Sequence, residues 1–148
     1  MEDGRCALRW VIQNAGKFLF DVDRLVVTGD SAGSHLALTA GMLPESAGLH
    51  GRCPGPEALK VAGIVNWSGV TDVVDVVEGA NQPPYAVRWL ENVPDRLEVA
   101  RRASPIQYVR AGLPAIVTVH GDADVVAPYS HAVRPHQALD EAKVRIDC

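Results

Sequence analysis

The 148-residue sequence predicts an α/β domain, with a mostly parallel sheet of about four strands and helices on both faces. Two observations lead to this fold class. Short apolar segments alternate along the chain with segments of helical periodicity. Two of the apolar segments are also nearly uniformly apolar, which is typical of parallel strands covered on both sides. The length suits a single domain over residues 1–148.

The first part of the chain is expected to form a helix, a strand and a second helix. Asp3 is placed to cap the first helix, over residues 3–18, whose apolar positions at helical spacing are Leu8, Val11, Ile12 and Ala15. Residues 23–29, DRLVVTG, form a short β-branched run that ends in glycine, as a strand before a turn does. The next helix, over 34–43, has its stripe at Leu36, Thr39, Ala40 and Leu43.

The second part repeats this alternation. Strands are expected at 60–67, at the start of 114–128, and from residue 143, where KVRIDC begins another strand. Helical potential lies between them, at 83–93 and 94–103. A further helix over 129–142 is expected to be broken or kinked near Pro135.

Charge and hydropathy exclude several classes of partner. The net charge is −4, and Lys and Arg are scattered, so the chain has no basic patch to hold nucleic acid. No run of eighteen apolar residues is present, and the N-terminus begins acidic rather than with the order of a signal peptide. We therefore expect a cytoplasmic protein without membrane or nucleic-acid partners.

The cysteines give no sign of a metal or redox site. Cys6, Cys53 and Cys148 are odd in number, widely spaced and form no C-x-x-C pair. They are expected to be reduced, incidental thiols, and we expect neither a metal nor a cofactor.

The segment Gly29-Asp30-Ser31-Ala32-Gly33 matches the pattern G-x-S-x-G between a predicted strand and a predicted helix. In this context the serine lies on a tight turn, and glycines at both flanks avoid collisions with neighbouring backbone. Ser31 is therefore the candidate nucleophile. The Ala32 N–H, at the start of the helix, is the candidate oxyanion donor. The alternative is that Ser31 only caps the helix.

Three segments, RLVVTGDSAGSHLALTAGML, RASPIQYV and PAIVTVHGDADVVAPYSHAVRPHQAL, resemble the small esterase and lipase-like members of the α/β-hydrolase superfamily. The resemblance runs from about residue 5 to the C-terminus and implies a partial α/β-hydrolase fold. It implies Ser31 as nucleophile and Asp124, the second aspartate of HGDAD, as the triad acid. The alternative for Asp124 is a turn-forming or capping role, although Asp122 suits a turn better.

The resemblance also implies parts that this chain lacks. Related sequences have an H-G-G-G-like loop before the nucleophile, which supplies a second oxyanion donor, and a catalytic histidine after the last core strand, beyond residue 148. The chain is therefore expected to be a truncated, C-terminal portion of a hydrolase. Within it, His131 and His136 are the only plausible substitutes for that histidine, although solvated helix positions explain them more simply. His35 is expected to be structural.

The missing part also affects the sheet. In the family the nucleophile strand is central, so without its neighbour the segment RLVVT becomes an open edge. We expect a homo-oligomer or a strand-exchanged dimer through this edge.

The leading functional hypothesis is hydrolysis of small-molecule carboxylic esters through an acyl-serine intermediate. A catalytically incomplete hydrolase-like fragment is the alternative, and a nucleotide-binding domain ranks last because GDSAGS does not match G-x-G-x-x-G. Ser68 is a weak rival nucleophile. The aromatic residues Trp67, Tyr85 and Trp89 could line an acyl pocket, but core or lid packing is the more common role for such residues.

Overall fold

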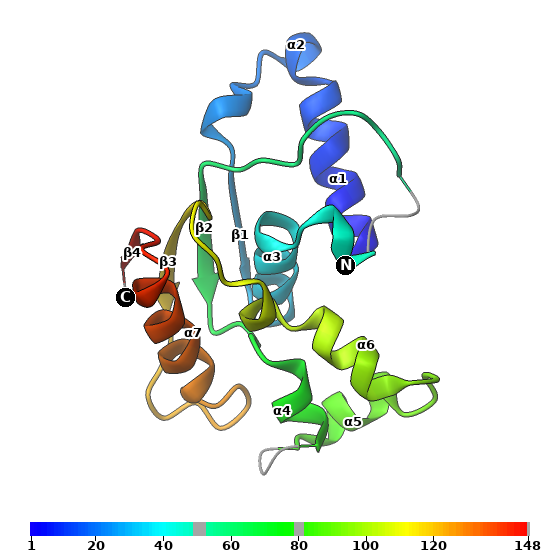
Figure 1. Cartoon of the computed structure of the whole chain (residues 1–148), viewed down its shortest axis with the longest axis vertical. Coiled ribbons are helices and arrows are strands. Elements are labelled where there is room, and N and C mark those ends of the chain that lie inside the picture. Colours follow the sequence, from blue (N-terminus) through cyan, green and yellow to red (C-terminus); the bar gives the residue numbers. More distant parts are fainter. Residues whose placement is uncertain (49–52, 79–81, 148) are drawn as a thin grey trace.

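The computed structural model describes residues 1–48, 53–78 and 82–147 (Figure 1). Its centre is a four-stranded sheet in the order β1-β2-β3-β4, in which every pair of neighbours is parallel. The strands are β1 (Val26–Asp30), β2 (Gly63–Trp67), β3 (Ala115–Val119) and β4 (Ile146–Asp147). The predicted α/β class and all four predicted strands are confirmed.

The helices connect these strands or lie before them. The α-helices are α1 (Glu2–Gln13), α2 (Ala15–Phe18), α3 (Ala32–Met42), α4 (Val73–Glu78), α5 (Pro84–Leu90), α6 (Arg96–Ala103) and α7 (Ser130–Glu141). Short 3-10 turns lie at Val22–Arg24, Glu45–Ala47 and Pro105–Tyr108. Because α1 begins at Glu2 after the capping position of Met1, Asp3 lies in the first turn and is not the cap.

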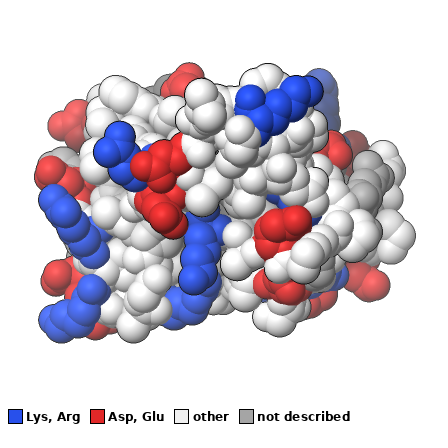
Figure 2. Space-filling model, turned by 90° about the horizontal axis from the view of Figure 1, so that it is seen from above, with Lys and Arg blue, Asp and Glu red and all other residues white. Residues whose placement is uncertain are grey.

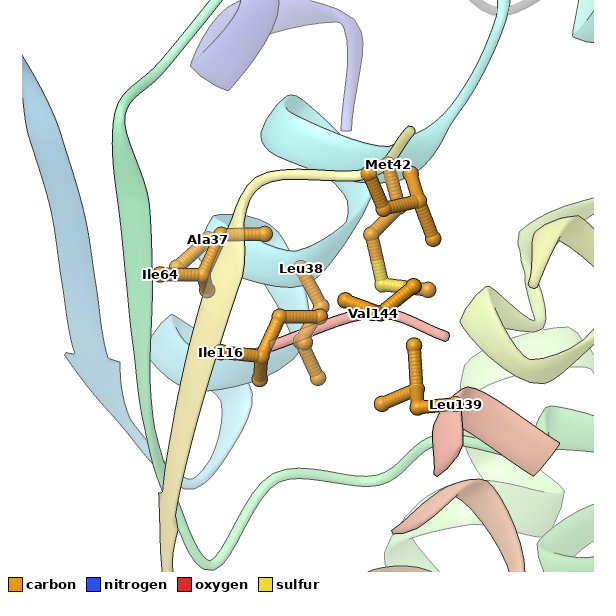
Figure 3. Close-up of a cluster of buried hydrophobic side chains, with 8 residues drawn as sticks. Ala37, Leu38, Met42, Ile64, Ile116, Leu139 and Val144 are labelled. Atoms are coloured by element: carbon orange, nitrogen blue, oxygen red, sulfur yellow. The ribbon is translucent and has the colours of Figure 1, made fainter. Parts of the chain in front are cut away.

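One face of the sheet carries the main core. A row of apolar residues crosses all four strands in register: Val27, Ile64, Ile116 and Ile146. Helix α3 packs on this row through Ala37, Leu38 and Met42, and α7 through Leu139 (Figure 3). Helix α3 is buried nearly all round, and of its predicted stripe Leu36 is the exposed member, at 40%.

The opposite face of the sheet is largely exposed in the described part of the chain. Its side chains include Val26 (57% exposed), Trp67 (46%), Val117 (40%) and Val119 (44%). The expected helices therefore cover one face, through α3 and α7, and not both. Apolar strands suggest burial on two sides, but the sequence of a strand does not say whether the covering segment is present.

Helices α4, α5 and α6 form a second layer beyond the carboxyl ends of the strands (Figure 1). Their shared core is small and apolar, and its fully buried members are Val73, Val76, Val77, Ala86, Leu90, Ala100 and Ala103. Ligands of open parallel sheets bind at the carboxyl ends of the strands. The three helices therefore lie where they can form one wall of a site.

Helix α7 continues through Pro135, so the expected break does not occur, and the alternative of a kink stays a prediction. Proline has no N–H, so the carbonyl of His131, one turn earlier, lacks its usual helical donor. Thr71 Oγ1 donates to that carbonyl at 2.8 Å. A side chain from outside the helix thus replaces the missing hydrogen bond.

Strand β1 pairs only with β2 among the described residues, so the predicted open edge at this strand is confirmed. The expected self-association through this edge stays a prediction.

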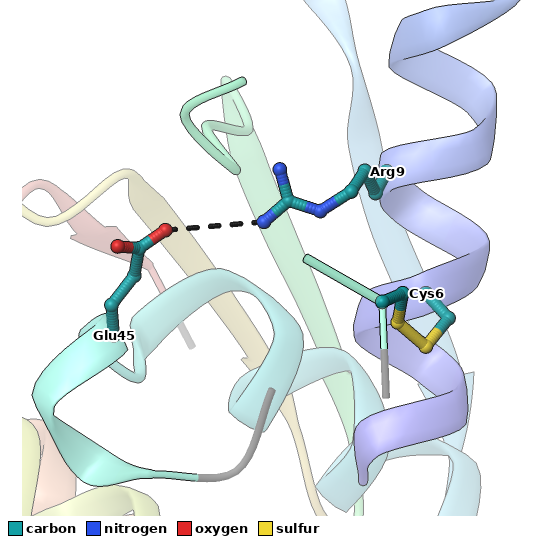
Figure 4. Close-up of a disulfide and its surroundings, with 4 residues drawn as sticks. Cys6, Arg9 and Glu45 are labelled. Carbon is teal, nitrogen blue, oxygen red and sulfur yellow. Dashed lines mark ion pairs between the residues drawn. A yellow bond between two sulfur atoms is a disulfide. The ribbon is translucent and has the colours of Figure 1, made fainter. Parts of the chain in front are cut away.

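Cys6 and Cys53 form a disulfide that joins α1 to the segment before β2 (Figure 4). The expectation of reduced, incidental thiols is therefore wrong for this pair, and Cys148 lies outside the described residues. Two buried arginines of α1 add further contacts, Arg9 to the segment before β2 and Arg5 to the end of α3. Arg9 Nη1 donates to the carbonyls of Gly55 (2.8 Å) and Glu57 (2.9 Å), and Arg5 Nη1 donates to that of Leu43 (2.7 Å). Spacing in sequence gives no sign of this pairing, because the cysteines are 47 residues apart.

The distribution of charge and the hydropathy of the helices agree with what the sequence predicts. On the face shown in Figure 2, Lys and Arg side chains are interspersed with Asp and Glu. Within the described ranges, no helix has the length and apolar character that crossing a membrane requires.

Candidate active site

Ser31 lies at the turn between β1 and α3, with a backbone conformation that few residues adopt. Its φ is 52° and its ψ is −115°. A non-glycine residue in such a region costs about 1–3 kcal/mol and persists only when its surroundings hold it there. Two hydrogen bonds do so: Ser31 N donates to Trp67 O at 2.8 Å, and Ser31 O accepts from His35 N at 3.1 Å. Ser31 thus lies on a strained strand-to-helix turn, the elbow that the G-x-S-x-G pattern predicts.

The two glycines of the motif are not equivalent. A Cβ on Gly29 would overlap the backbone carbonyl of Gly33 and lie 2.7 Å from the N of Ser34. A Cβ on Gly33 would meet nothing within 4 Å. The close approach of the two backbones therefore requires glycine at position 29. At position 33 a side chain would cause no collision, contrary to the expectation for both glycines.

The Ser31 hydroxyl is available for chemistry. Ser31 is exposed and its side chain makes no capping hydrogen bond to α3, so the capping alternative has no support. The Ala32 N–H follows immediately, at the first helical position, where a helix has no internal acceptor for it. A developing oxyanion at this position would also meet the positive end of the helix dipole.

A pocket of about 400 Å³ opens beside Ser31 and Ala32. Its walls come from α3, the segment after β2, and the second helical layer, and include His35, Leu36, Val70, Tyr85 and Trp89. Of the three aromatic residues considered for an acyl pocket, Tyr85 and Trp89 therefore line it. Trp67 instead lies on the exposed face of the sheet.

Asp124 is held by its own loop. Its Oδ1 accepts hydrogen bonds from the backbone N–H groups of Val126 (2.8 Å) and Ala127 (2.9 Å). The N–H groups of Ala127 and Val126 hold the pKa of Asp124 below its usual value, so the carboxylate is ionised. Its other oxygen, Oδ2, lies 3.5 Å from His120 Nε2. The turn-forming role considered for Asp124 is therefore real, and it occupies one carboxylate oxygen.

Tyr85 links the Asp124 loop to the pocket of Ser31. Its hydroxyl donates to Val126 O at 3.3 Å, and its ring lines the pocket. Burial and the negative charge of Asp124 raise the pKa of Tyr85, which keeps the phenol protonated as a donor. Ser31 and Asp124 thus border a common region, although no direct contact joins them in the described residues.

His35 is structural, as expected from its place one turn after Ser31. Its Nδ1 lies 2.8 Å from Val70 O, and because a carbonyl only accepts, Nδ1 carries the proton. Burial lowers the pKa of His35, so the ring is neutral.

His131 does not occupy the solvated helix position expected for it. It is 1% exposed, and its Nδ1 accepts from the N–H groups of Thr71 (3.2 Å) and Asp72 (3.3 Å). Its Nε2 lies 3.5 Å from Asp75 Oδ2, and burial lowers the pKa of the ring. These contacts favour a structural role over proton transfer to Ser31. His136 is only partly buried, and its substitute role stays a prediction.

Ser68, the rival nucleophile, shares one feature with Ser31. It follows a strand and has a positive φ of 49°. The next helix begins only at Val73, so no row of helical N–H groups follows the serine. An oxyanion at Ser68 would lack the donors that α3 offers at Ser31.

A parallel sheet with a strained serine between a strand and a helix defines the α/β-hydrolase class. The BD-FAE family model matches residues 1–139, and the chain belongs to this family.

Several proteins of known sequence or structure that resemble the chain are named esterases. The chain is 28% identical to esterase LipQ of Mycobacterium tuberculosis over 95% of its own length and 34% of that protein. It is 32% identical to esterase LipC of the same organism, over 88% of its length and 33% of that protein. The butyrate-bound esterase 2 of Thermogutta terrifontis superposes with a TM-score of 0.75 at 28% identity, over 99% of this chain and 51% of that one. A truncated carbohydrate esterase from gut microbiota gives a TM-score of 0.74 at 25% identity, over 99% and 57%.

The chain thus spans about a third of the curated relatives and about half of the solved structures that it matches.

One residue near the site, Asn66, belongs to none of the sequence motifs and is found only in the structure. It is 2% exposed and lies beneath the elbow, where its amide contacts Ser34 and Thr118. The available signal is a lone amide in the otherwise apolar strand β2, since buried polar groups need partners.

Proposed function

We propose that the whole protein hydrolyses carboxylic esters through an acyl-serine intermediate on Ser31. Ser31 Oγ attacks the ester carbonyl carbon, and its proton passes through an imidazole to the leaving alcohol. Water then attacks the acyl-serine and releases the acid. The observation that carries this proposal is the exposed, strained Ser31 at the mouth of an apolar pocket.

Other groups have supporting roles in this proposal. The Ala32 N–H stabilises the oxyanion, and a second donor comes from a loop of the kind that related sequences carry before the nucleophile. Asp124 orients the imidazole, which comes from a histidine beyond residue 148. The family resemblance supports this arrangement, because related sequences carry the histidine after the last core strand.

The pocket supports a short acyl group. Its volume of about 400 Å³ and its aromatic walls suit a small apolar chain. The esterase of Thermogutta terrifontis has been solved with propionate and with butyrate bound. For the alcohol half we propose small molecules that include carbohydrates, by analogy with the carbohydrate esterase.

The second candidate is that these 148 residues alone are catalytically incomplete. A specific observation favours it: within the described residues, no hydrogen bond joins Ser31 Oγ to a histidine. An unactivated hydroxyl is a poor nucleophile.

A fluorophosphonate probe distinguishes the two candidates. We expect covalent labelling of the whole protein, loss of labelling in its Ser31→Ala variant, and full labelling in its Ser68→Ala variant. Ser68 is the matched control because it also follows a strand with a positive φ. Mass spectrometry of the labelled peptide identifies the modified serine. If the 148 residues alone fold but are not labelled while the whole protein is, the second candidate holds for this part. Labelling of the whole protein that survives Ser31→Ala would overturn the assignment of the nucleophile.

A further inference from the structure

A buried chain of polar side chains runs beneath the elbow. Ser34, in the first turn of α3, donates through Oγ to Asn66 Oδ1 at 2.6 Å. The N–H of Gly69 donates to the same oxygen at 3.1 Å. Asn66 Nδ2 donates to Thr118 Oγ1 at 3.3 Å. Ser34 is 0% exposed and Asn66 is 2% exposed, so water does not compete for the bonds to Asn66 Oδ1, whereas the bond to Thr118 is partly buried.

The orientation of the Asn66 amide follows from its partners. The Gly69 N–H can only donate, so the atom facing it is the carbonyl oxygen of the side chain. The NH2 group therefore faces Thr118, whose hydroxyl accepts. The space around the amide is also closed, because a Cβ on Gly69 would overlap Asn66 Oδ1 and lie 2.9 Å from Ser34 Cβ.

The position of Asn66 connects the two halves of the site. In the sheet it lies opposite Gly29 of the elbow on one side and opposite Thr118 on the other. Strand β1 leads directly to Ser31, and β3, which carries Thr118, leads to the loop of Asp124. One amide thus bonds the nucleophile helix and the acid strand at the ends that carry these residues.

We propose that Asn66 is a positioning residue, which sets the orientation of the Ser31 elbow relative to the Asp124 loop. The proposal rests on the proposed function for the roles of these two residues. Apolar side chains fill the same face of the sheet at Ile64 and Ile116, so an apolar residue would suffice for packing at this position. A hydrogen-bonded amide fixes direction as well as distance, because a displaced partner would leave a polar group buried and unpaired.

Two substitutions each remove one end of this chain of hydrogen bonds without changing Ser31 or Asp124. Thr118→Val keeps the shape of the side chain and removes only the acceptor on β3. Ser34→Ala removes the donor on α3. Leu139→Ala is the control, since Leu139 belongs to the same main core but not to the polar chain. All three are compared under conditions where each is fully folded.

The first measurement is the rate of fluorophosphonate labelling at Ser31. We expect Thr118→Val and Ser34→Ala to slow it by about tenfold to 100-fold, the usual effect of displacing a reacting group by a fraction of an ångström to one ångström. Leu139→Ala should leave the rate unchanged. Equal rates in all three variants would overturn the proposal.

The second measurement does not need activity. Amide hydrogen exchange is followed at Ser31, whose N–H bonds to Trp67 O, and at Ala127, whose N–H bonds to Asp124. We expect Thr118→Val to speed exchange at both amides by about fivefold, as for loss of one buried hydrogen bond, and Leu139→Ala to speed neither. If the whole protein is not labelled, the proposed function fails while exchange still decides the role of Asn66. Exchange that changes at neither amide, or equally in the control, would overturn that role.

Discussion

The elbow and the Asp124 loop lie at the ends of two parallel strands but are held in different ways. Ser31 is fixed by a backbone bond to β2, by the contact between Gly29 and Gly33, and by the buried chain through Ser34. Asp124 is fixed by N–H groups of its own loop, two and three residues away. The loop is also open to solvent, since Val125 is 92% exposed.

The difference teaches which parts of the candidate site a local sequence can specify. The strained turn at Ser31 is held by contacts with other strands and helices, so its conformation depends on the packing of the core. The Asp124 carboxylate is held by hydrogen bonds from residues next to it along the chain. The elbow should therefore respond to changes throughout the core, whereas the Asp124 loop should respond to changes within itself and to loss of the Asn66–Thr118 hydrogen bond on the strand before it.

The largest expected effect comes from the elbow glycines. Gly29→Ala should lower the free energy of unfolding by about 3 kcal/mol or more, because its Cβ would overlap backbone that cannot move without opening the turn. Gly33→Ala meets no atom within 4 Å and should change stability by less than about 1 kcal/mol. Urea unfolding of both variants measures the difference. Similar losses for the two would show that the elbow is not held by this contact.

A smaller effect on the free energy of unfolding is expected in the Asp124 loop. Asp124→Ala removes the acceptor of two backbone N–H groups and should cost about 1–2 kcal/mol. Asp124→Asn keeps an oxygen for the same two bonds and should cost less. Chemical denaturation gives both values, and amide shifts at Ser31 serve as the readout of the elbow. A shift of the Ser31 amide comparable to those at Val126 and Ala127 would mean that the elbow depends on the hydrogen bonds within the Asp124 loop.

The smallest expected effect is a pH dependence of stability, to which one buried histidine near each region contributes. His35 lies one turn after Ser31, and His131 lies in α7, the helix that follows the Asp124 loop. Burial lowers the pKa of each below its unfolded value near 6.5. Below about pH 6.5 the unfolded chain binds more protons than the folded one, so stability should fall as the pH is lowered towards the folded pKa values. Above that pH the contribution is fully present.

Urea unfolding at pH 7.5 and pH 5.5 tests this expectation. His35→Asn is the informative variant, because its amide NH2 can replace Nδ1 as donor to Val70 O and does not titrate. It should weaken the pH dependence. A stability that does not change between the two pH values would contradict the argument for both rings.

Local signals in the sequence predicted much of this molecule. The alternation of apolar and helical segments gave the strands in their order, and G-x-S-x-G between two of them located Ser31. What could not be predicted depends on pairing across long distances. The disulfide joins cysteines without a motif, and the donor that carries α7 past Pro135 is Thr71, more than sixty residues earlier. The exposed sheet face was missed because valine-rich strands look the same whether or not a helix covers them.

The disulfide between Cys6 and Cys53 has a consequence for how the molecule comes apart. The covalent ring that it closes contains β1, Ser31 and all of α3, whereas Asp124 and α7 lie outside. A ring with its ends 47 residues apart restricts the unfolded chain by about 4 kcal/mol in the chain-entropy account. The disulfide therefore stabilises chiefly the segment that carries Ser31. Reduction would remove this restriction of the unfolded chain and would lower the stability of that segment more than that of the Asp124 loop.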